Sequence, residues 1–207
     1  MKRLLGWTAL GLTLAVPAYA QAPAPAGQAP AAPATGGVAV ANPHYVAIPM
    51  EITVNKPVAD VWKRVGKYCD IGEWLPQLAC TMQSGKDGEF GAVRSLAGGR
   101  ILEILVGKTE FSYSYTQPVR DGQPYNMYHG TLEARPVTDK SSKLVYTLFF
   151  DNSMLADDAA HEADRARRVA QFTTALQNMK ILAEGGTLPP APARGAGAPP
   201  AGGGPGR

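Results

Sequence analysis

Two residues of opposite charge, Arg94 and Glu103, lie on either side of the dipeptide Gly98-Gly99. If these glycines form a two-residue hairpin turn, counting outward along both strands brings Arg94 directly opposite Glu103. An ion pair removed from water is costly unless its remaining donors and acceptors find partners, so this pair could anchor a polar group of a ligand. The alternative is a structural cross-strand pair that binds nothing.

Three tyrosines, Tyr113, Tyr115 and Tyr128, lie in segments expected to be strands. Their hydroxyl groups could bind a ligand, or their rings could simply fill a core. A similar ambiguity applies to the large apolar residues of the helical segments, Trp74, Phe172 and Leu176.

Several other chemistries are not expected. His44, His129 and His161 are scattered, and neither they nor the cysteines have the spacing of metal ligands. The sequence has no nucleophile elbow, P-loop or dinucleotide fingerprint. We therefore expect neither a metal nor a cofactor, and we assign no catalytic residue. His129 follows Tyr128 on a strand, so the two side chains should point to opposite faces.

The elements that position these residues begin with an alternating segment, residues 46–54, which predicts a half-buried strand. Pro49 cannot donate to a neighbouring strand, which indicates a sheet edge or a bulge. Pro57 is expected to start an amphipathic helix. Asp70 and Glu73 have capping-box spacing, which predicts a second short helix that ends before Pro76.

Residues 78–151 form short alternating runs between turn signals, and without crossover helices these predict an antiparallel sheet. Phe111, Tyr113 and Tyr115 are expected on one face of one strand. From Asp157 to Gly185 a single apolar stripe predicts one long helix that packs on the sheet.

Residues 1–20 have the charged start, apolar run and Ala18-Tyr19-Ala20 site of a signal peptide, which predicts export to the periplasm or beyond and a mature protein beginning at Gln21. Residues 21–43 and 187–207 are rich in Pro, Ala and Gly, and we expect both to be disordered. Between them, residues 44–186 have the length of one domain.

Charge argues against a nucleic-acid partner. Four of the 20 Lys and Arg residues lie outside the expected domain, leaving 16 against 17 Asp and Glu, so the domain is nearly neutral. The basic run Arg165–Arg168 is interpreted as the solvated face of a helix. The apolar run near the N-terminus is too short for a stable membrane anchor.

Cys69 and Cys80 are the only cysteines. Because export favours disulfides, we expect them to be bonded to each other, which would stabilise the fold by about 2 to 3 kcal/mol. Two separate buried thiols are the alternative.

The order of elements resembles the helix-grip fold of the SRPBCC superfamily, which includes polyketide cyclase/dehydrase-like proteins, START domains and birch-pollen-allergen-like proteins. The resemblance covers residues 46–184 and is carried by five short segments: 55–62 (NKPVADVW), 74–76 (WLP), 91–94 (GAVR), 103–105 (EIL) and Tyr128. It implies an α+β fold, in which about seven antiparallel strands wrap around a long C-terminal helix and two short helices follow the first strand.

The resemblance also implies an apolar cavity between sheet and helix, with Arg94, Glu103 and Tyr128 pointing into it. We therefore expect a binding protein for a hydrophobic or aromatic small molecule. One alternative is a cyclase or dehydratase-type enzyme using the cavity Arg, Glu and Tyr residues; another is an interaction module with a filled core. The ligand and the oligomeric state are not predicted. The candidate ligand-binding residues are Arg94, Glu103, Tyr113, Tyr115, Tyr128, Trp74, Phe172 and Leu176.

Overall fold

A computed structural model describes residues 42–189. The expected signal peptide, nearly all of the first expected linker and most of the last one lie outside these residues. The described part contains seven strands, three α-helices and two 3-10 helices: β1 (Tyr45–Val54), α1 (Val58–Val65), η1 (Tyr68–Asp70), α2 (Ile71–Trp74), η2 (Pro76–Leu78), β2 (Cys80–Ser84), β3 (Val93–Leu96), β4 (Ile101–Thr109), β5 (Ser112–Thr116), β6 (Asn126–Thr138), β7 (Ser141–Asp151) and α3 (Asp158–Ala183).

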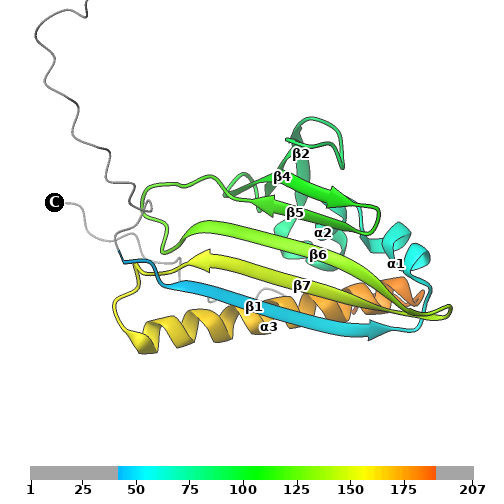
Figure 1. The fold of residues 1–207 in the computed structure, drawn as a ribbon. Coiled ribbons are helices and arrows are strands. Elements are labelled where there is room, and N and C mark those ends of the chain that lie inside the picture. The colour runs from blue at the N-terminus through cyan, green and yellow to red at the C-terminus, as the bar shows by residue number, and fades with distance from the viewer. Residues whose placement is uncertain (1–41, 190–207) are drawn as a thin grey trace, which may run out of the picture. The chain divides into compact units, whose positions relative to one another are not determined.

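The seven strands form one antiparallel sheet in the order β1-β7-β6-β5-β4-β3-β2. The long helix α3 runs along one side of the sheet and packs against β1 and β7 (Figure 1). The predicted helix-grip fold is therefore confirmed. Among the described residues, no helix combines the length and the apolar character needed to cross a membrane.

The alternation in the first strand predicted its buried face, and Pro49 indicated an edge or a bulge. Ile48 and Val54 are buried, whereas Ala47 and Glu51 are exposed. β1 is an edge strand, which explains how Pro49 is tolerated without a second hydrogen-bonded neighbour.

One local prediction around the short helices, the capping box of Asp70 and Glu73, was wrong. The side chain of Asp70 makes no cap bond to α2 and instead accepts a hydrogen bond from the backbone N–H of Lys67, at 2.9 Å. Glu73 pairs with Arg64 at 2.6 Å. The Asp70 carboxylate therefore caps η1, the short helix that it ends, rather than α2, the helix that follows it.

A second correction concerns Phe111. It lies in the two-residue turn between β4 and β5, not on the face of a strand with Tyr113 and Tyr115. Those two tyrosines do share the inner face of β5, at 3% and 1% exposure.

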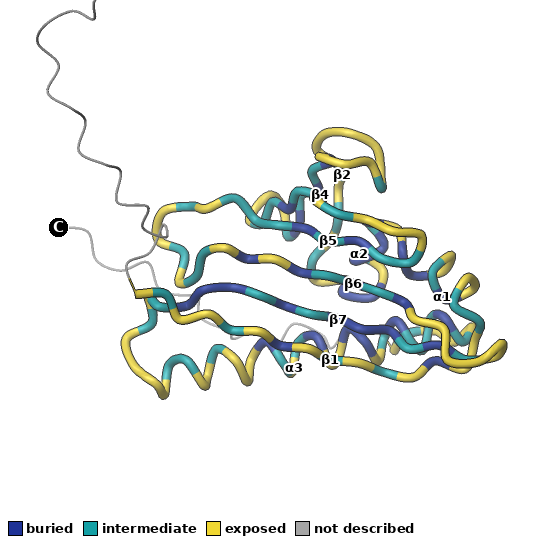
Figure 2. The backbone as a smooth tube through the Cα atoms, viewed as in Figure 1, coloured by how far each residue is buried: buried dark blue, intermediate teal, exposed yellow. Residues whose placement is uncertain are grey.

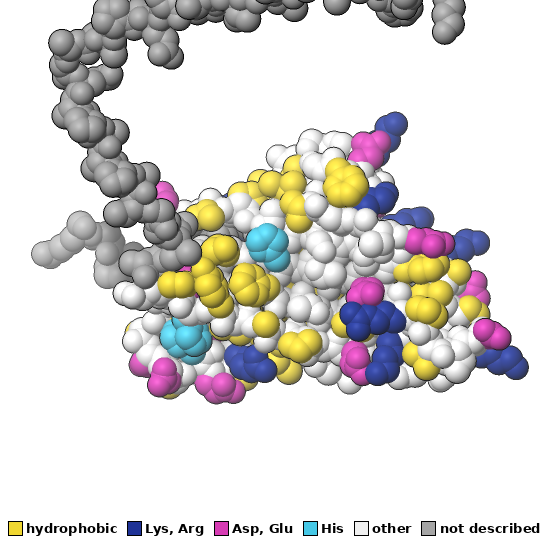
Figure 3. Space-filling model, viewed as in Figure 1, with side chains coloured by type: hydrophobic (Ala, Val, Ile, Leu, Met, Phe, Trp, Pro, Cys, Tyr) yellow, Lys and Arg dark blue, Asp and Glu magenta, His cyan; other side chains and the backbone are white. Residues whose placement is uncertain are grey.

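The core lies between the sheet and α3, and it includes β7 and the inward stripe of α3 (Figure 2). The stripe contains Phe172, Leu176, Met179 and Ala183, while Val169 is only half-buried. On the molecular face shown in Figure 3, basic and acidic side chains lie beside one another rather than forming a patch of one sign.

Candidate functional site

The predicted pair of Arg94 and Glu103 is buried in the interior of the domain. The two residues are opposite each other on β3 and β4. Arg94 Nε donates to Glu103 Oε2 at 2.7 Å, and Arg94 Nη2 lies 2.6 Å from the same oxygen. Arg94 is fully buried and Glu103 is 3% exposed. The contact is therefore a buried ion pair.

Arg94 is further held by Tyr68 in η1. Its Nη1 donates to the Tyr68 carbonyl, and its guanidinium carbon lies 4.0 Å from the centroid of the Tyr68 ring and 4.8 Å from that of Tyr115. Burial by itself lowers the pKa of Arg94, but the Glu103 carboxylate and the neighbouring tyrosines outweigh it and hold that pKa well above its ordinary value. The side chain is therefore always charged.

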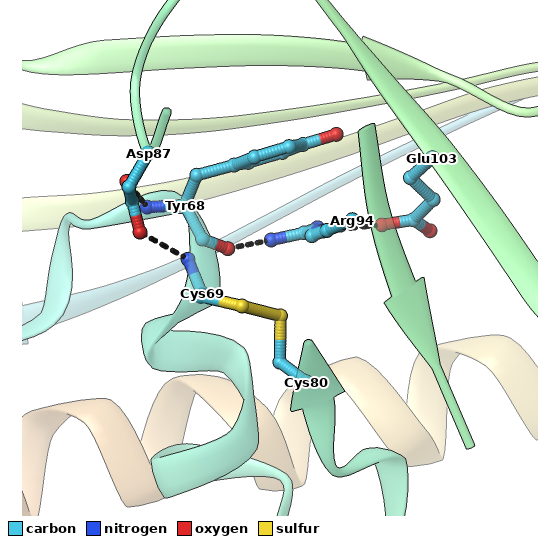
Figure 4. The surroundings of a disulfide bond; sticks show 6 residues. All are labelled: Tyr68, Cys69, Cys80, Asp87, Arg94 and Glu103. Atoms are coloured by element: carbon cyan, nitrogen blue, oxygen red, sulfur yellow. Dashed lines mark hydrogen bonds and ion pairs between the residues drawn. A yellow bond between two sulfur atoms is a disulfide. The ribbon is translucent and has the colours of Figure 1, made fainter. Parts of the chain in front are cut away.

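The segment that carries Tyr68 is fixed from two sides, as Figure 4 shows. The predicted disulfide joins Cys69 to Cys80 on β2. The carboxylate of Asp87, in the loop after β2, accepts hydrogen bonds from the backbone N–H groups of Tyr68 and Cys69, at 2.8 and 3.0 Å. These contacts set the position of the Tyr68 carbonyl that Arg94 reaches.

Glu103 links this pair to a pocket between the sheet and α3. Its second oxygen accepts a hydrogen bond from Gln117 at 2.9 Å, and the Gln117 carbonyl oxygen accepts one from the Tyr125 hydroxyl at 2.8 Å. Both residues belong to the loop between β5 and β6. This chain of polar contacts runs from the buried pair towards the pocket wall.

The pocket has a volume of about 110 Å³. One part of its wall is aromatic and another part is polar. It is lined by Ile71, Leu78, Leu96, Ile101, Glu103, Tyr115, Gln117, Tyr125, Tyr128, Arg167, Arg168, Gln171 and Phe172.

The pocket tyrosines stay protonated. Burial raises the pKa of Tyr115, Tyr125 and Tyr128 above the ordinary value for a phenol. The Tyr115 hydroxyl lies 2.8 Å from that of Tyr146. At neutral pH these side chains are hydrogen-bonding phenols rather than phenolate bases.

The structure separates the predicted site residues into two groups. Glu103, Tyr115, Tyr128 and Phe172 line the pocket. The others do not: Arg94 is enclosed behind Glu103, Trp74 and Leu176 are core residues, and Tyr113 lines a different hollow.

That second hollow lies beside α1 and has a volume of about 340 Å³. Its aromatic residues are Trp62, Tyr68 and Tyr113, and three lysines contribute to its rim. Because the rings of Tyr68, Tyr113 and Tyr115 gather around Arg94, this cluster lies between the hollow and the pocket beside α3.

The pocket residues that the sequence did not predict include Gln117, Tyr125 and Arg168. Gln117 and Tyr125 lie in an irregular loop, which carries no periodic signal. Arg168 was interpreted as part of a solvated run, yet it is only 5% exposed. Its Nε donates to Asp164, one turn earlier on α3, at 2.8 Å.

The histidines lie away from the pocket. His129 is exposed on the face of β6 opposite Tyr128, and its Nδ1 donates to the Met127 carbonyl at 2.8 Å. His44 and His161 stack on each other, with ring centroids 4.3 Å apart. Within residues 42–189, no three His, Cys, Asp or Glu side chains are grouped so that they could hold a metal ion.

Comparisons with known proteins agree with this architecture. Residues 46–184 match the family described as polyketide cyclase / dehydrase and lipid transport. No curated protein matches the sequence significantly.

Solved structures give the same fold. A Thermobifida fusca protein is 25% identical, with a TM-score of 0.57 over 69% of this chain and 97% of its own. The Zhui aromatase/cyclase from Streptomyces sp. R1128 is 17% identical, with a TM-score of 0.56 over 70% and 100%. Norcoclaurine synthase from Thalictrum flavum, solved with dopamine and hydroxybenzaldehyde, is 12% identical, with a TM-score of 0.52 over 68% and 87%.

Proposed function

The chain belongs to the polyketide cyclase/dehydrase and lipid-transport family, and from this premise we propose that it is a binding protein for an aromatic or hydrophobic small molecule. The observation that carries the proposal is the pocket between the sheet and α3. There the rings of Tyr115, Tyr128 and Phe172 stand beside the polar side chains of Glu103 and Gln117. Apolar walls with a few converging polar groups are the usual composition of small-molecule sites.

The size of the pocket limits what it can enclose. A volume of about 110 Å³ compares with an engineered apolar cavity of roughly 150 Å³ that binds benzene. We therefore infer that a single ring enters the pocket and that any larger part of the molecule remains at its mouth.

Binding is better supported than a cyclase or dehydratase reaction. The acid at the pocket is Glu103, and its oxygens already accept hydrogen bonds from Arg94 and Gln117. The tyrosines are neutral phenols, since burial raises the pKa of each. These groups are suited to holding a polar substituent, whereas a general base needs an accessible lone pair and a pKa near the working pH.

We further propose that the protein acts after export. The signal-peptide pattern of residues 1–20 and the disulfide both support this, because disulfides persist in oxidising compartments. N-terminal sequencing of protein recovered from the producing cells tests it: the proposal requires Gln21 at the start, and an intact Met1 on exported protein would contradict it.

The binding proposal is tested by titrating the purified protein with benzamide, a neutral single-ring probe, and recording amide NMR spectra. Gln171 lines the pocket from α3 and is only half-buried, so Gln171→Trp should fill the pocket without overpacking the core. Gln177→Trp places the same side chain at an exposed position of the same helix and serves as the control.

The wild type and Gln177→Trp should show saturable shifts around the pocket, and Gln171→Trp should show none although it melts cooperatively. Saturable binding that survives in Gln171→Trp would exclude this pocket. A wild type that binds no apolar probe would instead favour an interaction module.

A further inference from the structure

Arg168 is held by its neighbours in a way that leaves part of its guanidinium unused. The guanidinium carbon lies 4.1 Å from the ring centroid of Phe150, 4.7 Å from that of Tyr125 and 5.4 Å from that of Tyr128. Its Nε donates to Asp164. Its Nη2 is buried and has no hydrogen-bond partner among the described residues.

An unpaired donor on a buried cation is costly, because hydrogen bonds to charged groups contribute more than those between neutral groups. Arg168 lines the pocket, and so do Tyr125 and Tyr128, whose rings cover it. The residue that carries the unpaired Nη2 is therefore part of the wall of the proposed binding site. The stacked rings fix the plane of the guanidinium, so little freedom remains to be lost when a partner binds.

The charged residues that line the pocket, counted together with their ion-pair partners, leave one positive charge in excess. Arg94 and Glu103 neutralise each other. Asp164 is shared between Arg168 and Arg167, so two cations face one anion. Arg120, in the loop between β5 and β6, adds to the positive potential near Tyr125. Burial raises the pKa of the Tyr125 phenol, and the charges of Arg168, Arg167 and Arg120 oppose that rise.

We propose that Arg168 binds a carboxylate of the ligand, and hence that the protein takes aromatic carboxylic acids whose ring occupies the pocket. This inference rests on the proposed function, which it narrows to one chemical class. A planar carboxylate matches the guanidinium edge and supplies the one negative charge that the pocket lacks. The charge of Glu103 does not oppose this, because Arg94 compensates it and Gln117 occupies its second oxygen.

The test compares benzoate with benzamide, which share a ring and nearly the same shape but differ in charge. Both are titrated at pH 7 and fixed ionic strength into the wild type, Arg168→Gln and Arg165→Gln. Arg165 is an exposed residue of the same helix, less than one turn away, and its replacement removes the same charge outside the pocket.

In the wild type, benzoate should bind about tenfold or more tightly than benzamide, as expected for a charge-assisted hydrogen bond. Arg168→Gln should abolish this preference, so that benzoate binds no more tightly than benzamide, and Arg165→Gln should keep it. Arg168→Lys retains the charge but not the planar fork, so it should fold even if the glutamine variant does not, and it should retain only part of the preference.

Two results distinguish a failure of the carboxylate site from a failure of the proposed binding function. Equal affinities for benzoate and benzamide in the wild type, or a preference that survives in both Arg168 variants, would overturn the carboxylate site while leaving the pocket as a binding site. If neither probe binds, both the carboxylate site and the proposed binding function are contradicted. Sodium acetate at equal concentration should not displace benzoate; full displacement would mean that Arg168 binds small anions in general.

Discussion

Arg94 binds Tyr68 twice, through the backbone and through the ring. Its Nη1 donates to the Tyr68 carbonyl, and its guanidinium carbon lies 4.0 Å from the centroid of the Tyr68 ring. Because Tyr68 belongs to η1 and Arg94 to β3, one side chain fastens the short helical segment to the sheet. The stability of this segment should therefore depend on the ion pair that holds Arg94.

The first prediction concerns that ion pair. Arg94→Ala should destabilise the domain by about 3 to 5 kcal/mol, because it leaves the Glu103 carboxylate buried without its partner. Glu103→Ala should have a similar effect, and the double variant should lose much less than the sum of the two. Urea denaturation of the four proteins measures the coupling.

An internal control exists in the pair of Arg64 and Glu73. It has the same residue types nine positions apart, but its side chains are 42% and 53% exposed. The same double-mutant cycle there should give less than about 1 kcal/mol. If the buried pair shows no more coupling than this exposed one, the register of β3 and β4 is wrong.

The second prediction concerns the disulfide. Cys69 and Cys80 are separated by 11 positions, and replacing both with alanine should cost about 2 to 3 kcal/mol in the chain-entropy account. In this variant, hydrogen exchange should accelerate most at the backbone amides of positions 68 and 69, whose bonds to Asp87 depend on the position of this segment. Uniform acceleration along the chain would show that the disulfide does not act locally.

The third prediction concerns Gly130, which lies opposite Tyr115 on the neighbouring strand. A Cβ at this position would lie 2.3 Å from the Tyr115 ring, so Gly130→Ala should displace a ring of the pocket wall and cost about 1 to 3 kcal/mol. Gly107→Ala is the control, because its Cβ would lie 3.5 Å from Ser114, an ordinary contact. Thermal unfolding of both variants should show a loss at Gly130 alone, and equal losses would argue against this placement of the ring.

The fourth prediction concerns pH. Burial raises the pKa of Asp70 to about 6, above its value in the unfolded chain. Between about pH 4 and pH 6 the folded state therefore holds a proton that the unfolded chain has released, so this group makes the free energy of unfolding fall as pH rises. By pH 7 the loss should amount to about 3 kcal/mol.

Asp70→Asn keeps an oxygen for the Lys67 amide but cannot ionise. Its stability relative to the wild type should therefore increase between about pH 4 and pH 7, as measured by urea denaturation at each pH. A difference that stays constant over this range would contradict the raised pKa.

The sequence was sufficient for the fold and for the ion pair because both follow from periodic patterns. Alternation along each strand determines which face is buried, and the hairpin determines which residues meet. The turn itself was predicted too short. It contains four residues rather than two, because Ala97, with a φ of 52°, and Arg100 lie outside the strands together with the two glycines. The pairing of Arg94 with Glu103 survives this error, because one residue is added on each side.

The rest of the site depends on contacts between distant segments. Arg168 resembles its exposed neighbours in the sequence, and its burial is decided by Phe150 on β7 and Tyr125 in a loop. Gln117 gains its role only where the loop brings it to Glu103. Local periodicity does not describe such contacts, since they arise from tertiary packing.

The central claim, that an aromatic ring binds between the sheet and α3, is tested most directly by intermolecular NOEs from bound benzamide. The ring protons should give NOEs to the side chains of Tyr128 and Phe172, and these should disappear in Gln171→Trp. NOEs confined to Trp62 and Tyr113, which line the hollow beside α1, would contradict the claim, as would saturable binding with no NOE to the pocket.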